Sequence, residues 1–316
     1  MIFVEQALQT LVAGLSVGCI YGLLCVGLAL IFGIMRVINF AQGDLMMVGM
    51  YVAIFVASFV LPPAVFGVAT PFIAALLVVP VMFIFGYLLS WVLISRTAGL
   101  KAASLTEGDA HQAQLILSLG LALILQNGAH ILLGSSPAAM ISPLSSSAWE
   151  VPLLIDDFSA IFFNKARTVN AVICVVISVV LFWFIQKTRI GKSLRAAASN
   201  SEAAIYMGIN VSKAHNIAFA LGTAIAGIAG GLLVIYYPVQ PHVGVDFVII
   251  MYAGVVLGGM GSIVGAFWGG MTIGLVQQLS TLFVPIQLQN TAIFVVFLFV
   301  LLIKPEGFFG RTVERA

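Results

Sequence analysis

Residues 11–34 read LVAGLSVGCIYGLLCVGLALIFGI, a run of 24 residues without one charged side chain. As an α-helix with a rise of 1.5 Å per residue, this run is about 36 Å long, which exceeds the hydrocarbon core of a bilayer, about 30 Å. Gly14, Gly18 and Gly22 recur at four-residue spacing, so they lie on one face of the helix. Such a face lets a neighbouring helix approach closely in lipid. The run therefore predicts a transmembrane helix that packs tightly within a bundle.

Apolar runs continue along the rest of the chain, whose residues are 62% hydrophobic and only 8% charged. The further runs are Leu45–Leu61, Pro71–Ile94, Leu115–Leu133, Val169–Ile185, Ile217–Tyr237, Phe247–Leu257, Ile263–Val284 and Thr291–Ile303. Together they predict an all-α, polytopic transmembrane helical bundle with about nine crossings, forming a single domain over residues 1–316. Eight or ten crossings are the alternatives, because Phe247–Leu257 is short and Val37–Asp44 is either a loop or a re-entrant break.

Basic residues are distributed unevenly among the connecting segments. An N-terminus outside and a C-terminus inside would place all but two of the 13 Lys and Arg residues in the cytoplasm, as the positive-inside rule requires. The two others, Lys165 and Arg167, end an external (periplasmic) segment over residues 134–167. In it, VPLLIDDFSAIFF (residues 151–163) predicts a stretch partly folded on the membrane surface. We expect Lys165 and Arg167 to contact acidic groups of a soluble binding protein, with anchoring of the next helix as the alternative.

Polar residues interrupt the apolar pattern at RVINFAQGDLMM, residues 36–47. Asn39, Gln42 and Asp44 lie here between two apolar runs, where polar groups are costly and often functional. We therefore predict that these three residues line a translocation path. The alternative is that Asn39 or Asp44 caps the helix of the following apolar run. A second break, GGMGSIVGAFWGG at residues 258–270, contributes the other predicted path residues, Gly258 and Gly261.

The sequence lacks the common catalytic and nucleotide-binding motifs. HExxH does not occur, and the GLSVG of residues 14–18 lies inside the first apolar run, so it is not the GxSxG elbow that exposes a serine nucleophile. The four His and three Cys residues have no ligand spacing. Gly191-Lys192-Ser193 resembles the end of a P-loop, but Gln186 stands where GxxxxGK[ST] requires its first glycine. We therefore predict a transport subunit with no catalytic residues, no metal site, no cofactor and no nucleic-acid partner.

Three stretches carry a resemblance to a known family. They are GLSVGCIYGLLCVGLALIFGIMRVINFAQGDLMMVGMYVA (residues 14–53), LRAAASNSEAAIYMGINVSKAHNIAFALGTAIAGIAGGLL (194–233) and GVVLGGMGSIVGAFWGGMTIGLV (254–276). Through them the chain resembles the LivH-type permeases of the ABC importers of branched-chain amino acids. The resemblance implies a multi-pass protein of the bacterial inner membrane. Its partners would be a second, homologous permease, two ATPase subunits that hydrolyse ATP, a periplasmic substrate-binding protein and membrane lipid.

The resemblance implies a small polar or amphipathic solute as the substrate. Branched-chain amino acids are the first candidates, and urea, short amides and aromatic acids are the alternatives within the family. A different class of function, an autonomous secondary transporter driven by an ion gradient, is the main rival. It would require a relay of carboxylates within the membrane, for which Asp44 is the one candidate that the sequence offers.

The resemblance also explains why so apolar a chain has a polar segment at residues 188–215, because the family couples permease to ATPase through a short cytoplasmic helix. Here Ser201, followed by Glu202–Met207 and Gly208, predicts a capped helix of about two turns. We expect two small residues to seat in a groove of the ATPase and two charged residues to contact its rim. These predicted coupling residues are Ala203 and Ala204 in the groove, and Arg195 and Glu202 at the rim.

Overall fold

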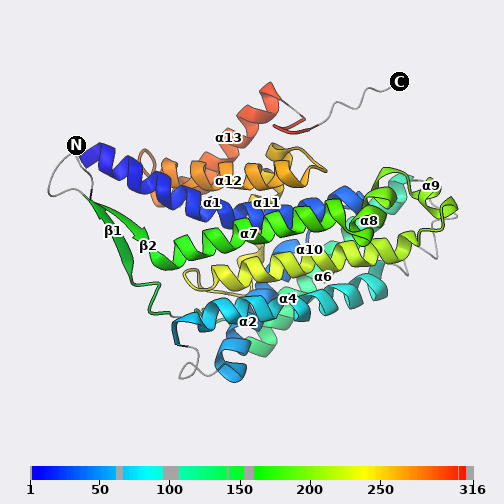
Figure 1. Cartoon of the computed structure of the whole chain (residues 1–316), viewed down its shortest axis with the longest axis horizontal. Helices are drawn as coiled ribbons and strands as arrows, with labels where there is room; N and C mark the ends of the chain where they lie inside the picture. Colours follow the sequence, from blue (N-terminus) through cyan, green and yellow to red (C-terminus); the bar gives the residue numbers. More distant parts are fainter. Residues whose placement is uncertain are drawn as a thin grey trace.

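The computed structural model describes residues 2–61, 67–94, 107–140, 142–152, 160–304 and 306–310. Its helices are α1 (Ile2–Met35), α2 (Gln42–Phe55), α4 (Thr70–Leu89), α6 (Glu107–Leu133), α7 (Lys165–Lys187), α8 (Arg189–Ser199), α9 (Ser201–Tyr206), α10 (Val211–Leu233), α11 (Val243–Gly258), α12 (Ile263–Ser280) and α13 (Gln289–Ile303). Each of the nine apolar runs forms one of the long helices, which confirms the all-α transmembrane fold (Figure 1). Within the described part of the chain, seven helices are long and apolar enough to cross a membrane, and α11 is a shorter apolar helix.

Helices α1 and α12 pack against each other through glycines. A Cβ atom at Gly18 would lie 2.7 Å from the carbonyl oxygen of Met271, and one at Gly22 would lie 2.8 Å from that of Phe267. Since no Cβ atom fits here, the two backbones are in direct contact. Close packing of this kind supplies the attraction that lipid-embedded helices need in order to associate. The glycine stripe of residues 14–22 is therefore a helix contact, as predicted.

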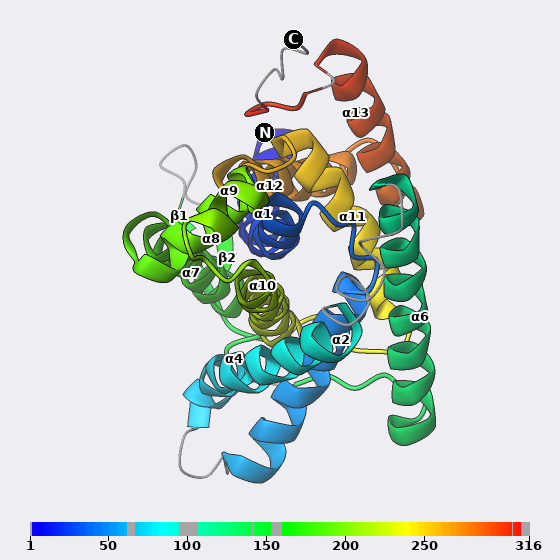
Figure 2. The ribbon, with the colours of Figure 1, turned by 90° about the vertical axis from the view of Figure 1, so that its right-hand side faces the viewer.

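Helix α10 lies in the middle of the bundle, between α1, α2 and α4 (Figure 2). Its small residues face different neighbours: Gly222 lies against α1, Gly227 against α4 and Gly230 against α2. A side chain at Gly230 would lie 3.0 Å from the Met46 side chain. Because it is surrounded by other helices, α10 is almost completely buried.

The two halves of the chain repeat one arrangement in opposite directions. Helices α1 and α10 are antiparallel, since Gly222 meets Ile31 whereas Ile225 meets Gly27. Helix α4 packs on α10 and α12 packs on α1, so the third long helix of each half contacts the first helix of the other half. Helices α2 and α11 begin side by side at glycines 43 and 244. Inverted repeats with interrupted helices are common in transporters.

The segment between α1 and α2 turns back into the bundle. Arg36 follows the end of α1 with a φ of 55°, a left-handed conformation that is uncommon outside glycine and that reverses the chain. The Gln42 side chain reaches Gly27, which precedes Met35 by eight residues, or about 12 Å along the helix. Helix α2 therefore starts inside the bundle, which confirms the re-entrant alternative.

A β-hairpin forms in the external segment, where β1 (Ala148–Pro152) pairs antiparallel with β2 (Ala160–Asn164). Both ends of the stretch 151–163 belong to these strands, and its position on the membrane surface stays a prediction. The Gln9 side chain of α1 donates to the carbonyl oxygen of Phe162 at 3.3 Å and accepts from its N–H at 3.2 Å, which ties the hairpin to α1. Residues 153–159 lie outside the described residues. The hairpin lies at one end of the molecule, and α8 and α9 lie at the other (Figure 1).

Candidate translocation path and coupling surface

Asn39 and Gln42 hold the start of α2 inside the bundle. The Asn39 Nδ2 atom donates to Gln42 Oε1 at 3.2 Å, and Asn39 Oδ1 accepts from the N–H of Ala41 at 3.2 Å. The Gln42 Nε2 atom donates to the carbonyl oxygen of Gly222 at 3.1 Å. Both side chains are buried. Since a buried amide left without a partner costs about 1–3 kcal/mol, these bonds fix the re-entrant segment against α10.

Asp44 lies in the first turn of α2, but its side chain contacts two other helices. Its Oδ1 atom accepts from Nε2 of Gln126, on α6, at 3.0 Å. A Cβ atom at Gly244 would collide with the same oxygen, so the carboxylate lies against the first turn of α11. The amino end of a helix attracts a negative charge. Asp44 therefore caps a neighbouring helix electrostatically, and the alternative that it caps α2 is wrong because α2 starts before it, with Ala41 as its N-cap.

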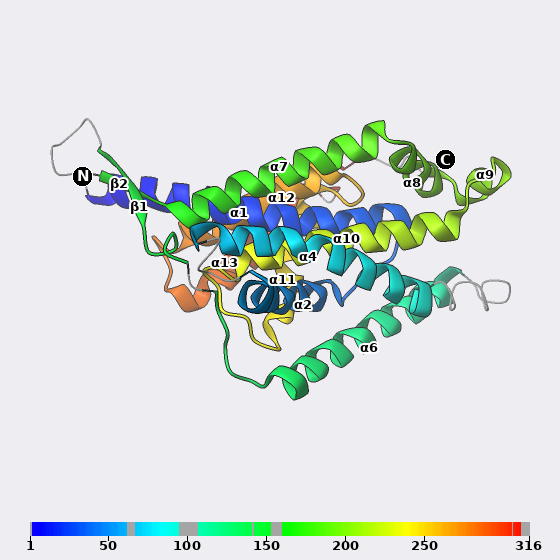
Figure 3. The same ribbon diagram turned by 60° about the horizontal axis from the view of Figure 1, so that its bottom comes forward.

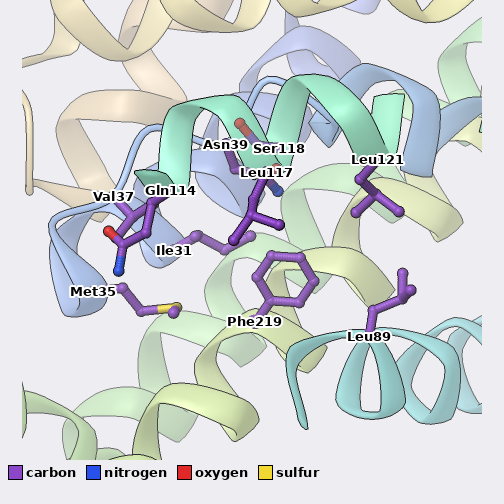
Figure 4. Close-up of a pocket in the computed structure, with 10 residues that line it drawn as sticks. All are labelled: Ile31, Met35, Val37, Asn39, Leu89, Gln114, Leu117, Ser118, Leu121 and Phe219. Carbon is purple, nitrogen blue, oxygen red and sulfur yellow. The ribbon is translucent and has the colours of Figure 1, made fainter. Parts of the chain in front are cut away.

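A small cavity borders Asn39 on the side of the bundle that carries α8. It is lined by Ile31, Met35, Val37, Asn39, Leu89, Gln114, Leu117, Ser118, Leu121 and Phe219 (Figure 4). Its volume is about 30 Å³, which is enough for one or two water molecules. The Ser118 hydroxyl, on α6, accepts from the N–H of Phe40 at 3.3 Å, so α6 holds the re-entrant segment from outside. Of the five residues predicted for the path, Asn39 is the one that borders this cavity.

Gly258 and Gly261 lie at the junction of α11 and α12. A Cβ atom at Gly258 would overlap Gly265 of α12, so the two helices touch through their backbones. Gly261 lies in the exposed turn between them with a φ of 90°, a conformation that favours glycine. Packing and turn geometry explain both glycines, and their place in a translocation path stays a prediction.

The residues resembling a P-loop lie in the first turns of α8. The Thr188 hydroxyl accepts from the N–H of Gly191 at 3.1 Å, and the Thr188 carbonyl oxygen accepts from the N–H of Lys192 at 3.0 Å. These N–H groups are already bonded, so they are not free to bind a phosphate. Among the residues that the structure describes, no group of three or more His, Cys, Asp or Glu side chains could hold a metal ion.

The predicted start of α9 is wrong by one residue, whereas its predicted end is confirmed. The Asn200 side chain caps it by accepting from the N–H of Ala203 at 3.0 Å. The prediction that Ser201 is the cap is wrong, because Ser201 is the first helical residue and its hydroxyl donates to the Ala197 carbonyl at 3.0 Å. Asn is as good a cap as Ser, so the signal was present one residue earlier. Gly208 follows the helix with a φ of 78°, as a C-terminal glycine does.

The exposed face of α9 also differs from the predicted one. Ala203 is exposed, but Ala204 is 4% exposed and packs inside the chain, so the prediction that it seats in a partner's groove is wrong. Ile205, Tyr206 and Met207 are instead 59%, 88% and 82% exposed, three large side chains in succession. Our sequence analysis missed them because it concentrated on small residues. Their large apolar character within a hydrophilic loop was the available signal.

The predicted rim residues lie on either side of the α8–α9 junction. The Arg195 guanidinium donates to the side-chain and backbone oxygens of Gln186 at 2.9 and 3.2 Å, which ties α8 to the end of α7. Glu202 is exposed in the first turn of α9. Arg36 extends this connection, since it donates to the carbonyl oxygen of Ala198 at 3.4 Å. The coupling segment is thus attached to both α7 and the end of α1.

The two external cations contact aromatic rings of their own chain. Lys165 Nζ lies 5.9 Å from the centre of the Trp149 ring in β1, and Arg167 Cζ lies 5.4 Å from that of Tyr236. Both side chains are half-buried. Cation–π contacts of this kind contribute about 0.5–1 kcal/mol at exposed sites. They support the anchoring alternative, and docking of a binding protein at these residues stays a prediction.

Comparison with known proteins assigns this chain to a family. The family model described as "Branched-chain amino acid transport system / permease component" matches residues 10–303. The high-affinity branched-chain amino acid transport system permease protein LivH of Salmonella typhimurium is 30% identical over 312 residues, 96% of each chain. The corresponding BraD of Pseudomonas aeruginosa is 29% identical over 316 residues, again 96% of each chain.

A third relative covers less of the chain. The probable branched-chain amino acid transport permease protein LivH of Methanocaldococcus jannaschii is 30% identical over 266 residues, 82% of this chain and 76% of that one. No solved structure matches the chain. Because the family model extends from α1 to the last residue of α13, the chain belongs to the family of branched-chain amino acid transport permease components.

Proposed function

We propose that this permease is the membrane subunit of an ATP-driven importer and forms the translocation route for a small polar or amphipathic solute. Branched-chain amino acids are the first candidates, because the relatives are named for their transport. The chain has no P-loop of its own, so ATP hydrolysis must come from partner subunits. As a multi-pass protein of the inner membrane, it would dock two such ATPases and a second, homologous permease.

The observation that carries this proposal is the exposed tip of α9. Ile205, Tyr206 and Met207 project from the end of the bundle that the charge pattern assigns to the cytoplasm. Three successive large apolar side chains in water are unfavourable unless another protein covers them. Tyr206 is the best candidate for the main contact, since buried tyrosines are common hot spots that contribute about 2 kcal/mol or more to binding.

The opposite end of the molecule would receive the substrate. Here the β-hairpin extends beyond α1 and is tied to it through Gln9. Trp149 and Phe162 are about half exposed on the two strands. We propose that a periplasmic binding protein contacts this hairpin, with Lys165 and Arg167 at the edge of the contact.

Replacing Tyr206 with alanine tests the coupling surface. The tagged chain is purified from its own membranes in mild detergent, and the co-purifying ATPase and second permease are quantified. Loss of about 2 kcal/mol corresponds to roughly 30-fold weaker ATPase binding, with the second permease still bound. Phe283→Ala is the matched control, because Phe283 is a large apolar residue that is 78% exposed. It follows the end of α12, away from the coupling segment.

Two outcomes would contradict the proposal. Unchanged ATPase content in Tyr206→Ala complexes would show that the tip of α9 is not the docking surface. Purification of the wild-type chain alone, together with uptake driven by an ion gradient, would establish the secondary transporter instead.

A further inference from the structure

Three ionisable side chains gather on one face of the bundle, outside the cavity at Asn39. They are His130 near the end of α6, His242 at the start of α11 and Asp246 one turn later. The rings of His130 and His242 are 6.4 Å apart. His242 and Asp246 are four residues apart and therefore share one face of α11. We call these three residues the His–Asp patch.

The His–Asp patch lies deep in the apolar part of the molecule. Phe247, which follows Asp246, contacts the Tyr21 ring at a centroid distance of 5.9 Å. Tyr21 is near the middle of the apolar span of α1, Glu5–Met35. Asp246 is therefore at about mid-depth. His242 is about 6 Å nearer the hairpin end, because α11 rises 1.5 Å per residue toward the other end.

All three side chains are exposed on this chain. A charged aspartate at the centre of a membrane helix costs about 2.5–3.5 kcal/mol when lipid surrounds it. Such residues therefore face a protein interior or a water-filled route. Helices α6, α11 and α13 form one side of the molecule, and α6 runs along the outside of the bundle (Figures 2 and 3). The face that carries the His–Asp patch is open in the single chain.

The surroundings of the His–Asp patch are polar and held in place. Directly beside it, Gln126 of α6 donates to Asp44 at 3.0 Å, and Asp44 lies against the first turn of α11. Gln126 and His130 are four residues apart, so they share one face of α6. His242 is the N-cap residue of α11 but its side chain makes no capping hydrogen bond, and Asp246 lies in the first turn of the helix.

We propose that His130, His242 and Asp246 line the route of the transported solute and bind the two charges of a zwitterionic α-amino acid, the class of solute for which the relatives are named. Asp246 would pair with the ammonium group, and the two imidazoles would bind the carboxylate. Two imidazoles with ring centres 6.4 Å apart, and a carboxylate four residues after one of them, supply partners for the two charges of such a head group. Urea or a neutral amide requires neither charge to be paired. The inference rests on the proposed function and names the residues that would bind the substrate.

Cysteine labelling of the complete transporter in native membranes tests the route. Single variants His130→Cys, His242→Cys and Asp246→Cys are treated with a membrane-impermeant, charged methanethiosulfonate. Background is low, because the three native cysteines are buried. Val179→Cys is the control, since Val179 is 61% exposed on an apolar stretch of α7. We expect the patch cysteines to react at least tenfold faster than the control.

Protection then tests the substrate class. Saturating leucine should slow labelling of His130→Cys severalfold, whereas leucinamide and 4-methylpentanoate, which each lack one charge, should not. Asp246→Asn should lower ATP-driven leucine uptake at least tenfold while ATPase and second permease still co-purify.

If the patch cysteines react at the rate of Val179→Cys, the patch does not line a water-filled route. If leucine, leucinamide and 4-methylpentanoate protect equally, the patch does not bind a zwitterionic head group. A failure of the proposed function would be seen in a different experiment. The wild-type chain would then purify without an ATPase, and this result does not depend on the labelling rates.

Discussion

Gly43 is the position at which the packing of the two halves can be tested most directly. A Cβ atom at Gly43 would lie 2.8 Å from the carbonyl carbon and 3.1 Å from the Cα atom of Gly244, and still closer to the carbonyl oxygen. Carbon atoms in contact are normally about 3.5–4.0 Å apart, so Gly43→Ala must separate α2 from α11. The obstacle is backbone rather than a flexible side chain, which puts the cost near the upper end of the range for overpacking, about 3 kcal/mol.

Part of this cost is offset by helix propensity. Alanine is up to about 1 kcal/mol more favourable than glycine within a helix, so the net destabilisation is about 2 kcal/mol. Gly120→Ala on α6 is the matched control, because a Cβ atom there meets nothing within 4 Å. This substitution therefore adds the helix propensity of alanine without a steric cost. The two variants should therefore differ by roughly 3 kcal/mol in the free energy of unfolding.

The assay is unfolding of the purified wild-type, Gly43→Ala and Gly120→Ala proteins in detergent, together with uptake in cells. We expect a lower unfolding midpoint and reduced uptake for Gly43→Ala, because the starts of α2 and α11 shift relative to each other. Gly120→Ala should match or exceed the wild type in stability. Equal stability of the two variants would refute direct backbone contact between α2 and α11.

Two further predictions concern the re-entrant segment and the coupling helix. Asn39→Ala should leave Gln42 Oε1 and the Ala41 N–H without a partner, a cost of about 1–3 kcal/mol, and should reduce uptake without loss of subunit assembly. Normal uptake by this variant would place the path elsewhere. Asn200→Ala should remove the cap of α9, about 1 kcal/mol, and so speed hydrogen exchange at residues 203–207 roughly fivefold, whereas Ser201→Ala should not. If Ser201→Ala speeds exchange and Asn200→Ala does not, Ser201 is the cap.

Several features of this protein follow from local sequence. The membrane helices could be predicted because an apolar run longer than the hydrocarbon core has few alternatives to a helix in lipid. The stripe at Gly14, Gly18 and Gly22 predicted a helix contact, since small residues four apart share one face. The end of α9 at Gly208 was predictable because glycine readily adopts a positive φ. Each of these depends on residues that are neighbours in the chain.

The candidate sites depended on contacts between distant segments. Asp44 is in a sequence context that suits a helix cap, but Gln126 and the start of α11 determine what its carboxylate does. Ala204 is a small residue of the kind that suits a groove, but in the folded chain its side chain is only 4% exposed. The approach of Gly43 to Gly244 joins residues 201 positions apart, 244 minus 43.

Sequence by itself therefore determined that this chain is a helical membrane permease, where its helices lie and where they are interrupted. Only the tertiary structure decided that α2 and α11 start together in the interior, that Asp44 serves α11, and that Ile205, Tyr206 and Met207 form the exposed tip. The physical reason is that burial in lipid acts on each segment separately through its own length and polarity. Backbone contact, by contrast, depends on which two surfaces fit each other, and that is a property of pairs of segments.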